Sequence, residues 1–483
     1  MKRIYTVGSE GRERDTLALQ SGSASRFMNN AIELIERFCG VCIMTIKANE
    51  NVPYVDLYHG NDLAQLCGMR IPMVESYSAT TVPLVPDLTE ESGPVSVRDP
   101  FPFDIFSALR FWLADEAHIG VDQDCLDDHD RLRPCCSLQD KLGVKEIPVV
   151  NGYLMFFLRR VAMLLGHMPD SFLPAGKRCG VVLSHDVDDP INPDWRGLIW
   201  KARITAKYGK FRESLRFLKS AGKQAGHAWG KRTPHERHWL FEEVMDAEEC
   251  RGFHSTFFFS VRPCWAPGAS AYDVAYDIHD PQFRKVLRRI QLRGWDIGLH
   301  LSYKSTEGDA QILSERRSLE EAAGTPIIGN RHHYWHMKWP SWKTLQSHAS
   351  AGLRYDSSVA FNETPGFRLG IALPFFPWNP LTGERIATLQ IPCMCMDGSL
   401  FYQIDQTVDG AVSRIATLVD QLKCCRGVAA IDWHVRTSFP GSQEFRRWGE
   451  AYLAILDLLF SDKEVLVLSA KEAYEQFCRP VEH

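Results

Sequence analysis

The sequence predicts an α/β fold in which a β/α barrel follows a smaller α/β domain. The chain has 483 residues, which is too long for one typical hydrophobic core, so two or more domains are expected. From residue 176 onward, short apolar runs typical of strands alternate with amphipathic segments typical of helices, which indicates parallel βα units. About seven such strands favour a barrel over an open sheet.

The predicted strands of this second domain are short and apolar, and helical segments separate most of them. The strand-like runs are GVVLSH, HSTFFFS, WDIGLH, PIIGN, ATLQIP, GVAAIDW and EVLVLS. The clearest helical segments between them are PQFRKVLRRIQLRG, DAQILSERRSLEEAAG and FRRWGEAYLAILDLLF. The stretch 360–410 is rich in Pro and Phe, and we expect it to form an irregular rim over one end of the barrel.

The first domain is expected to span residues 1–175, with the barrel occupying 176–483. A segment rich in Pro and Gly, 166–178, is typical of a linker. Asp104 precedes an apolar helical stripe and is placed as the N-cap of that helix. The other predicted elements of this domain are the helices NAIELIERF and NGYLMFFLRRVAMLLG and the strands CIMTI and VPYVDLYHG. None of these elements indicates what the domain does.

Composition excludes several classes of function. Hydrophobic residues make up 45% of the chain and charged residues 24%, with a formal net charge of −5, so no nucleic-acid footprint is indicated. No apolar run is long enough to span a bilayer. The first residues lack the apolar core of a secretory signal, and we expect a cytoplasmic protein. The 14 cysteines fit buried thiols in that reducing compartment.

Chemistry-bearing residues stand at the ends of four predicted strands. The run CGVVLSHDVDDP carries Asp186 and Asp188, which face the same side in an extended segment. The strand WDIGLH ends in His300, PIIGN runs into Arg331, and GVAAIDW leads into His434. In parallel α/β folds the carboxyl ends of the strands meet at one rim, so these side chains should converge. Clustered carboxylates of this kind are costly to bury without a cation between them.

The region from about 178 to 478 resembles the polysaccharide deacetylase superfamily, also known as the NodB-homology or carbohydrate esterase family 4 proteins. SHDVDD is similar to its first motif, GWDIGLHLSYKS to its second, NRHHYW to its third, LRYDSSVAF to its fourth and AAIDWH to its fifth. The resemblance implies a distorted β/α barrel. It also places the chain near a subgroup with an appended N-terminal domain of obscure role.

The resemblance implies a role for each matching residue. Asp186 matches the general base, and Arg331 matches the residue that orients this base. Asp188 and His300 match metal ligands. His434 matches the general acid. The implied cofactor is a divalent metal ion, for which we expect zinc.

The sequence departs from the second motif at one position. The family places a second histidine four residues after the first, but Lys304 stands at that spacing after His300. His333, at the start of the strand-end loop that carries Arg331, is the candidate replacement ligand. His332 and His336 are weaker candidates, because adjacent residues of an extended chain point apart. The alternative for HHYWH is aromatic and imidazole packing around a substrate cleft.

Four residues are candidate substrate contacts, each with a structural alternative. Trp433 could stack on a sugar ring or form a wall, although it should point away from His434. Tyr334 could contact the substrate or belong to the aromatic packing considered for HHYWH. Arg368 could bind an anionic group or form a surface ion pair. Asp356 could line the cleft or cap a turn with the following serines. Asp397, in MDGS, is interpreted as a turn residue.

These observations favour a metal-dependent hydrolase that removes an acetyl or related acyl group from an N-acylated sugar or glycan precursor. Two alternatives remain open. The barrel could bind a glycan or partner without catalysis, given the missing histidine of the second motif. It could also hydrolyse a non-peptide C–N bond in a compound that is not a sugar.

Overall fold

The computed structural model describes most of the barrel and parts of the preceding region. The described residues are 22–39, 42–47, 53–58, 67–70, 103–165, 168, 171–190, 198–199, 202–203, 206, 211–228, 238–270, 272–337, 341–402, 404, 406–441 and 444–478.

A parallel sheet forms the framework of the barrel. Its hydrogen-bonded order is β10-β11-β4-β5-β6-β7-β8-β9, with β12 also paired to β4. The strands are β4 (Cys179–Val187), β5 (Thr256–Phe259), β6 (Asp296–Leu301), β7 (Gly329–His332), β8 (Tyr355–Asp356), β9 (Leu389–Gln390), β10 (Cys393–Met396), β11 (Val428–Asp432) and β12 (Val465–Leu468). All seven predicted strands are present, and the α/β barrel class is confirmed. The short strands β8 and β10 were not predicted.

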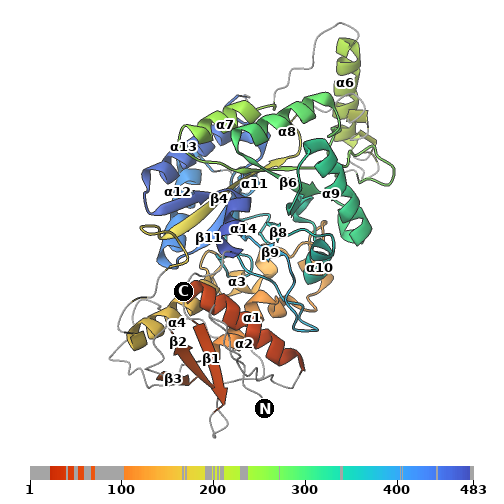
Figure 1. Cartoon of the computed structure of the whole chain (residues 1–483). Helices are drawn as coiled ribbons and strands as arrows, with labels where there is room; N and C mark the ends of the chain where they lie inside the picture. The colour runs from red at the N-terminus through yellow and green to blue at the C-terminus, as the bar shows by residue number, and fades with distance from the viewer. Residues whose placement is uncertain are drawn as a thin grey trace.

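Helices of the barrel region surround this sheet, except that α6 projects away from it at the top of Figure 1. They are α6 (Phe211–Ala228), α7 (Phe241–Glu249), α8 (Pro281–Arg293), α9 (Asp309–Ala323), α10 (Trp342–Ser350), α11 (Asp397–Phe401), α12 (Val408–Cys424), α13 (Arg446–Ser461) and α14 (Ala470–Cys478). The sequence of α8 shows why such a helix forms. Asp280 accepts a hydrogen bond from the backbone of Gln282, Pro281 opens the first turn, and Gly294 ends the helix with φ 93°.

The N-terminal region contributes helices and a small antiparallel sheet, β1-β2-β3. Its elements are α1 (Gly22–Cys39), β1 (Cys42–Lys47), β2 (Pro53–Tyr58), β3 (Cys67–Arg70), α2 (Ile105–Leu113), α3 (Leu138–Lys141) and α4 (Val149–Leu165). Asp104 caps α2 as predicted, since its carboxylate accepts hydrogen bonds from the backbones of Phe106 and Ser107. The predicted division at residue 175 stays a prediction.

The central strand β4 is buried along its whole length because hydrophobic cores lie on both of its faces. Val182 and Phe258 belong to a core that includes residues of α1, α2 and α4. Val181 and Phe257 face the other way, into the core beneath the barrel helices. This arrangement explains the continuous apolar run in the sequence of β4.

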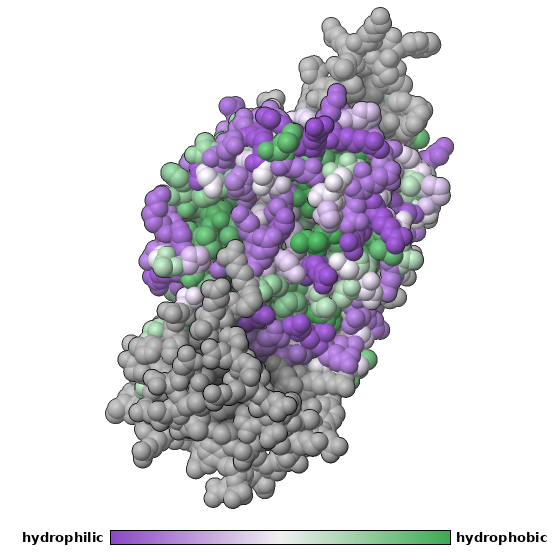
Figure 2. Space-filling view, in the orientation of Figure 1, coloured by the Kyte–Doolittle hydropathy of each residue, from purple (hydrophilic) through white to green (hydrophobic). Residues whose placement is uncertain are grey.

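The described surface of the barrel is mixed in polarity. In Figure 2, purple hydrophilic side chains cover much of the visible described face, and green hydrophobic ones gather in smaller groups between them. Among the described residues, no helix is both long enough and apolar enough to cross a membrane.

Candidate metal and catalytic site

The carboxyl ends of β4, β6, β7 and β11 meet at one end of the barrel, as the strand pattern predicted. The register pairs Asp186 with Phe258 and His300 with Arg331. Asp432, the last residue of β11, pairs with Ser184. These pairings bring side chains separated by more than 200 positions into one cluster.

Asp188, His300 and His333 form the first group of this cluster. Oδ1 of Asp188 lies 3.2 Å from Nε2 of His300 and 3.2 Å from Nδ1 of His333. The two histidine nitrogens are 2.8 Å apart. His333 thus lies where the sequence analysis placed the replacement ligand. Lys304, at the position of the family's second histidine, lies in the turn before a short 3-10 helix, Ser305–Glu307.

The three donor atoms fit a divalent cation. They lie within 4.8 Å of one another, and Oδ1 of Asp188 is buried without a well-formed hydrogen bond. Two imidazole nitrogens with one carboxylate oxygen are a ligand set of zinc and other first-row divalent ions. Burial raises the pKa of Asp188, but the charges of His333 and His434 outweigh it, so this pKa lies well below its usual value. The carboxylate is therefore ionised and available to a cation.

Two backbone carbonyl groups fix the orientation of the two histidine rings. Nδ1 of His300 lies 3.1 Å from the carbonyl oxygen of Arg331, and Nε2 of His333 lies 2.7 Å from that of Tyr272. Each ring therefore has one nitrogen engaged by protein and the other directed at Asp188. Such second contacts set the tautomer and hold a ligating imidazole in place.

Asp186 lies beside this group and is held by Arg331. Nη1 of Arg331 lies 2.9 Å from Oδ1 of Asp186, while Oδ2 of Asp186 lies 3.6 Å from Nε2 of His300. Burial raises the pKa of Asp186, but His300 and Arg331 outweigh it and lower the pKa overall. Asp186 is thus an ionised carboxylate with one oxygen fixed and the other directed toward the candidate metal group.

Arg331 is wholly buried and stacked between aromatic rings. Its guanidinium carbon lies 4.6 Å from the ring centroid of Phe258 and 5.1 Å from that of Trp335. Nη2 donates hydrogen bonds to the hydroxyls of Ser184 and Ser357. Because its planar group is fixed on every side, Arg331 can hold Asp186 in one orientation.

A third carboxylate, Asp432, was not predicted to take part. Its Oδ1 lies 2.9 Å from Nη1 of Arg331, and Asp432, Asp186 and His434 bring donor atoms within 4.8 Å of one another. Burial and the charge of Asp186 raise the pKa of Asp432 well above its usual value, despite Arg331. Its place in AAIDWH, two residues before His434, was the available sequence signal.

His434 lies between two carboxylates. Its Nε2 is 3.0 Å from Oδ2 of Asp188, and its Nδ1 is 2.9 Å from Oδ1 of Asp397. Burial lowers the pKa of His434, but Asp397 and Asp188 outweigh it, so the pKa is raised well above its usual value. The imidazole is therefore protonated near neutral pH, as a proton donor must be.

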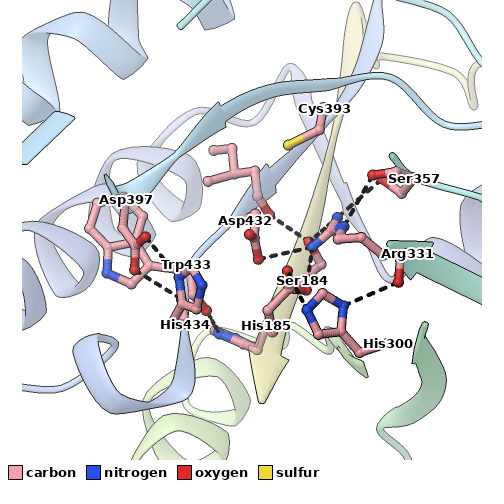
Figure 3. A network of polar contacts seen from close by, with 12 residues as sticks. Ser184, His185, His300, Arg331, Ser357, Cys393, Asp397, Asp432, Trp433 and His434 are labelled. Carbon is pink, nitrogen blue, oxygen red and sulfur yellow. Dashed lines mark hydrogen bonds and ion pairs between the residues drawn. The ribbon is translucent and has the colours of Figure 1, made fainter. Parts of the chain in front are cut away.

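The interpretation of Asp397 as a turn residue is wrong. The side chain is wholly buried, and it also accepts a hydrogen bond from the backbone of His434 (Figure 3). A second hydrogen bond comes from the hydroxyl of Thr437. Asp397 follows directly on β10, so it ends an apolar strand as Asp186 does. That shared pattern was the missed signal, hidden because β10 was not recognised. Arg436, 3.4 Å from Oδ2 of Asp188, was also missed.

The candidate substrate contacts separate into accessible and buried residues. Tyr334 is 38% exposed and lies beside His333, with ring centroids 4.6 Å apart. Trp433 and Asp356 are wholly buried, which contradicts substrate contact for both. Trp433 packs on Tyr452 and donates to the carbonyl of Thr437, because strand alternation turns it into the barrel core. Asp356 accepts hydrogen bonds from Ser358, the structural alternative considered for it.

Arg368 is also largely buried. It forms an ion pair with Asp115, with Nη2 of Arg368 3.1 Å from Oδ2 of Asp115. Together with Arg131, Trp335 and Asn362 it lines a cavity of about 50 Å³. Among the contacts described for Arg368, this pair fits the ion-pair alternative, although the pair is buried rather than at the surface.

No protein-family model and no curated protein matches the chain. Among solved structures, the chain is similar to a protein assigned to the polysaccharide deacetylases from Mycobacterium smegmatis (15% identity, 63% of this chain and 92% of that one, TM-score 0.41). It is also similar to an allantoinase (14%, 63% and 92%, 0.39) and to a family 4 acetyl xylan esterase from Clostridium thermocellum (12%, 62% and 93%, 0.29). Likenesses this distant transfer no activity to this chain.

Proposed function

We propose that the protein is a metal-dependent hydrolase that removes an acetyl or related acyl group from an N-acylated sugar or glycan precursor. The observation that carries this proposal is the grouping of Asp188, His300 and His333 between a fixed carboxylate, Asp186, and a protonated imidazole, His434. Hydrolysis of an amide needs a base on one side of the carbonyl and an acid at the leaving nitrogen.

The three-residue group would hold the metal, for which we propose zinc. Bound there, a divalent ion lowers the pKa of water toward neutrality and polarises an acyl carbonyl. His333 would bind the ion in its neutral form and so would have to release the proton that Asp188 favours on it, since Asp188 raises the pKa of His333 despite burial.

The remaining residues would move the protons. Asp186 accepts the proton of the attacking water through Oδ2, since Oδ1 is held by Arg331. His434 donates a proton to the leaving amine as the C–N bond breaks, and Asp397 keeps its ring oriented and charged. The products are the free amine and the carboxylic acid, so one water is consumed for each bond broken.

Two measurements test this proposal. Elemental analysis should find close to one divalent ion per chain in the wild type and much less in His300→Ala. Acetate release from N-acetylated hexosamine oligosaccharides should then depend on Asp186, with Asp186→Asn retaining metal and losing about 1000-fold in turnover. A wild type that takes up no metal after reconstitution would overturn the assignment and favour a barrel that binds without catalysis.

A further inference from the structure

A hairpin from the N-terminal region lies against the candidate active site. It spans 126–132 and is closed by an antiparallel bridge between Leu126 and Leu132. Asp127 organises its tip, because Oδ1 accepts hydrogen bonds from the backbones of His129 and Arg131. The tip therefore presents His129 on a defined turn, where a loose loop would present it in many orientations.

The hairpin holds a strained turn of the barrel. Tyr334 and Trp335, which follow His333 directly, have φ values of 60° and 53°, which are costly for residues with a side chain. Nη1 of Arg131 donates to the carbonyl oxygen of Tyr334 at 2.7 Å and to Oδ1 of Asn362 at 2.9 Å. The conformation that places Tyr334 beside His333 is thus supported from the N-terminal region.

The same hairpin completes a cluster of aromatic rings, defined as the aromatic cluster: His129, Tyr272, Tyr303 and Tyr334. The ring centroid of His129 lies 4.7 Å from that of Tyr334 and 5.0 Å from that of Tyr272. Nδ1 of His129 is also 2.9 Å from the hydroxyl of Tyr303. Each ring is only partly buried, and Tyr334 is the most exposed.

The position and chemistry of the aromatic cluster suit a sugar. Tyr334 contacts His333 through its ring, and the carbonyl of Tyr272 faces the other side of the same histidine. The cluster therefore adjoins the point where the scissile acyl group would lie. Aromatic faces bind the apolar C–H face of a pyranose, and the phenol and imidazole groups at their edges can exchange hydrogen bonds with its hydroxyls.

We propose that the aromatic cluster is a sugar-binding subsite and that the N-terminal region supplies its outer wall through His129. The inference rests on the proposed function for its substrate class, an N-acetylated hexosamine oligosaccharide. It gives the N-terminal region a part in substrate selection. The sugar ring stacks on the cluster while the acyl group of the reacting unit reaches His300 and His333.

The test is binding of N-acetylglucosamine trisaccharide by calorimetry, with the metal-loaded full chain. His129→Ala should weaken binding about tenfold, and His129→Phe, which keeps a flat ring, should recover most of the affinity. Asp128→Ala, an exposed change in the same hairpin, is the matched control and should bind as the wild type does.

The outcomes separate this proposal from the proposed function. Equal trisaccharide binding by His129→Ala and wild type, or no binding by either, overturns the subsite. The protein could also bind the trisaccharide through His129 while taking up no metal and releasing no acetate. That result would support the subsite and overturn the proposed hydrolase function. If His129→Ala releases acetate with the same KM as the wild type, the subsite proposal is wrong and the hydrolase proposal is supported.

Discussion

Two clusters in this barrel each contain one aspartate and two histidines, but the pKa of the aspartate is lowered in one cluster and raised in the other. Asp188 with His300 and His333 is an ionised group at the rim. Asp356 on β8, His332 on β7 and His348 on α10 form the second cluster, which is buried, with Nε2 of His332 2.8 Å from Nε2 of His348.

The difference lies in solvation and in the number of nearby charges. Burial raises the pKa of Asp356 to about 6 and lowers that of His348 to about 3, so burial favours the uncharged form of both side chains. The cluster of Asp188 is charged because His434 and His333 surround its carboxylate. His332 and His333 are adjacent in sequence, yet chain alternation sends one into each cluster. Composition alone therefore cannot distinguish a functional Asp–His cluster from a structural one.

The largest expected effect comes from removing the carboxylate of the charged cluster. Asp188→Ala should lose the metal and reduce acetate release by at least about 1000-fold, because the only anionic ligand of the three-residue group is gone. Metal content and turnover are the readouts. Asp356→Ala is the paired change, and it should keep full metal occupancy. If Asp356→Ala also lost metal, the two clusters would not differ in metal binding.

The adjacent histidines give a sharper test of the comparison. His333→Ala should weaken metal binding about 100-fold, measured by competition with a chelator. His332→Ala should bind metal normally but lose about 1–3 kcal/mol of stability, since Nε2 of His348 loses its contact with His332. If the two variants held metal equally well, His333 would not be a ligand.

Asp397 should affect turnover more than binding. Asp397→Asn removes the charge that keeps His434 protonated, so kcat should fall roughly 10- to 100-fold while KM is unchanged. Asp397→Glu should restore part of kcat. Ser399→Ala, a buried change one turn away, is the control. A rise in KM with kcat unchanged would show that Asp397 does not act through His434.

The smallest expected effect is a pH dependence from the neutral cluster. Because the folded pKa of Asp356 is about 6, raised from 3.8, its contribution to stability is present at low pH and is lost as the pH rises from about 4 to 6. Relative to wild type, the free energy of unfolding of Asp356→Asn should rise by about 2 kcal/mol between pH 4 and pH 7, measured by urea unfolding at each pH. A constant difference across that range would mean that folding does not raise the pKa of Asp356.

The residues that sequence reasoning placed correctly share one property: they lie at or just beyond the carboxyl ends of predicted strands. The strand β4 has nine buried residues, so its end and the positions of Asp186 and Asp188 could be read directly. The place of His333 followed from strand-end geometry in the same way. Asp397 was missed because β10, CMCM, resembles a run of structural thiols. Asp432 and Arg436 were missed because ion pairs between distant strands leave no local pattern.

The N-terminal contribution could not be predicted at all. The acidic and basic residues of 126–132 are typical of a solvated loop, and nothing near them in sequence marks Tyr334 as their neighbour. His129 and Tyr303 are 174 positions apart. Such contacts arise from the packing of the N-terminal helices against the barrel, which fixes where the hairpin lies.

The central place of β4 has a consequence for biosynthesis. It is the first barrel strand to leave the ribosome, yet two of its partners, β11 and β12, are among the last, and Ser184 bonds to a carbonyl 247 residues later. Until β11 and β12 have been synthesised, β4 lacks these hydrogen-bonding partners, and its apolar side chains lack part of their native packing. Contacts this distant slow folding and expose the nascent chain to aggregation, so the newly made protein should need a chaperone until translation ends.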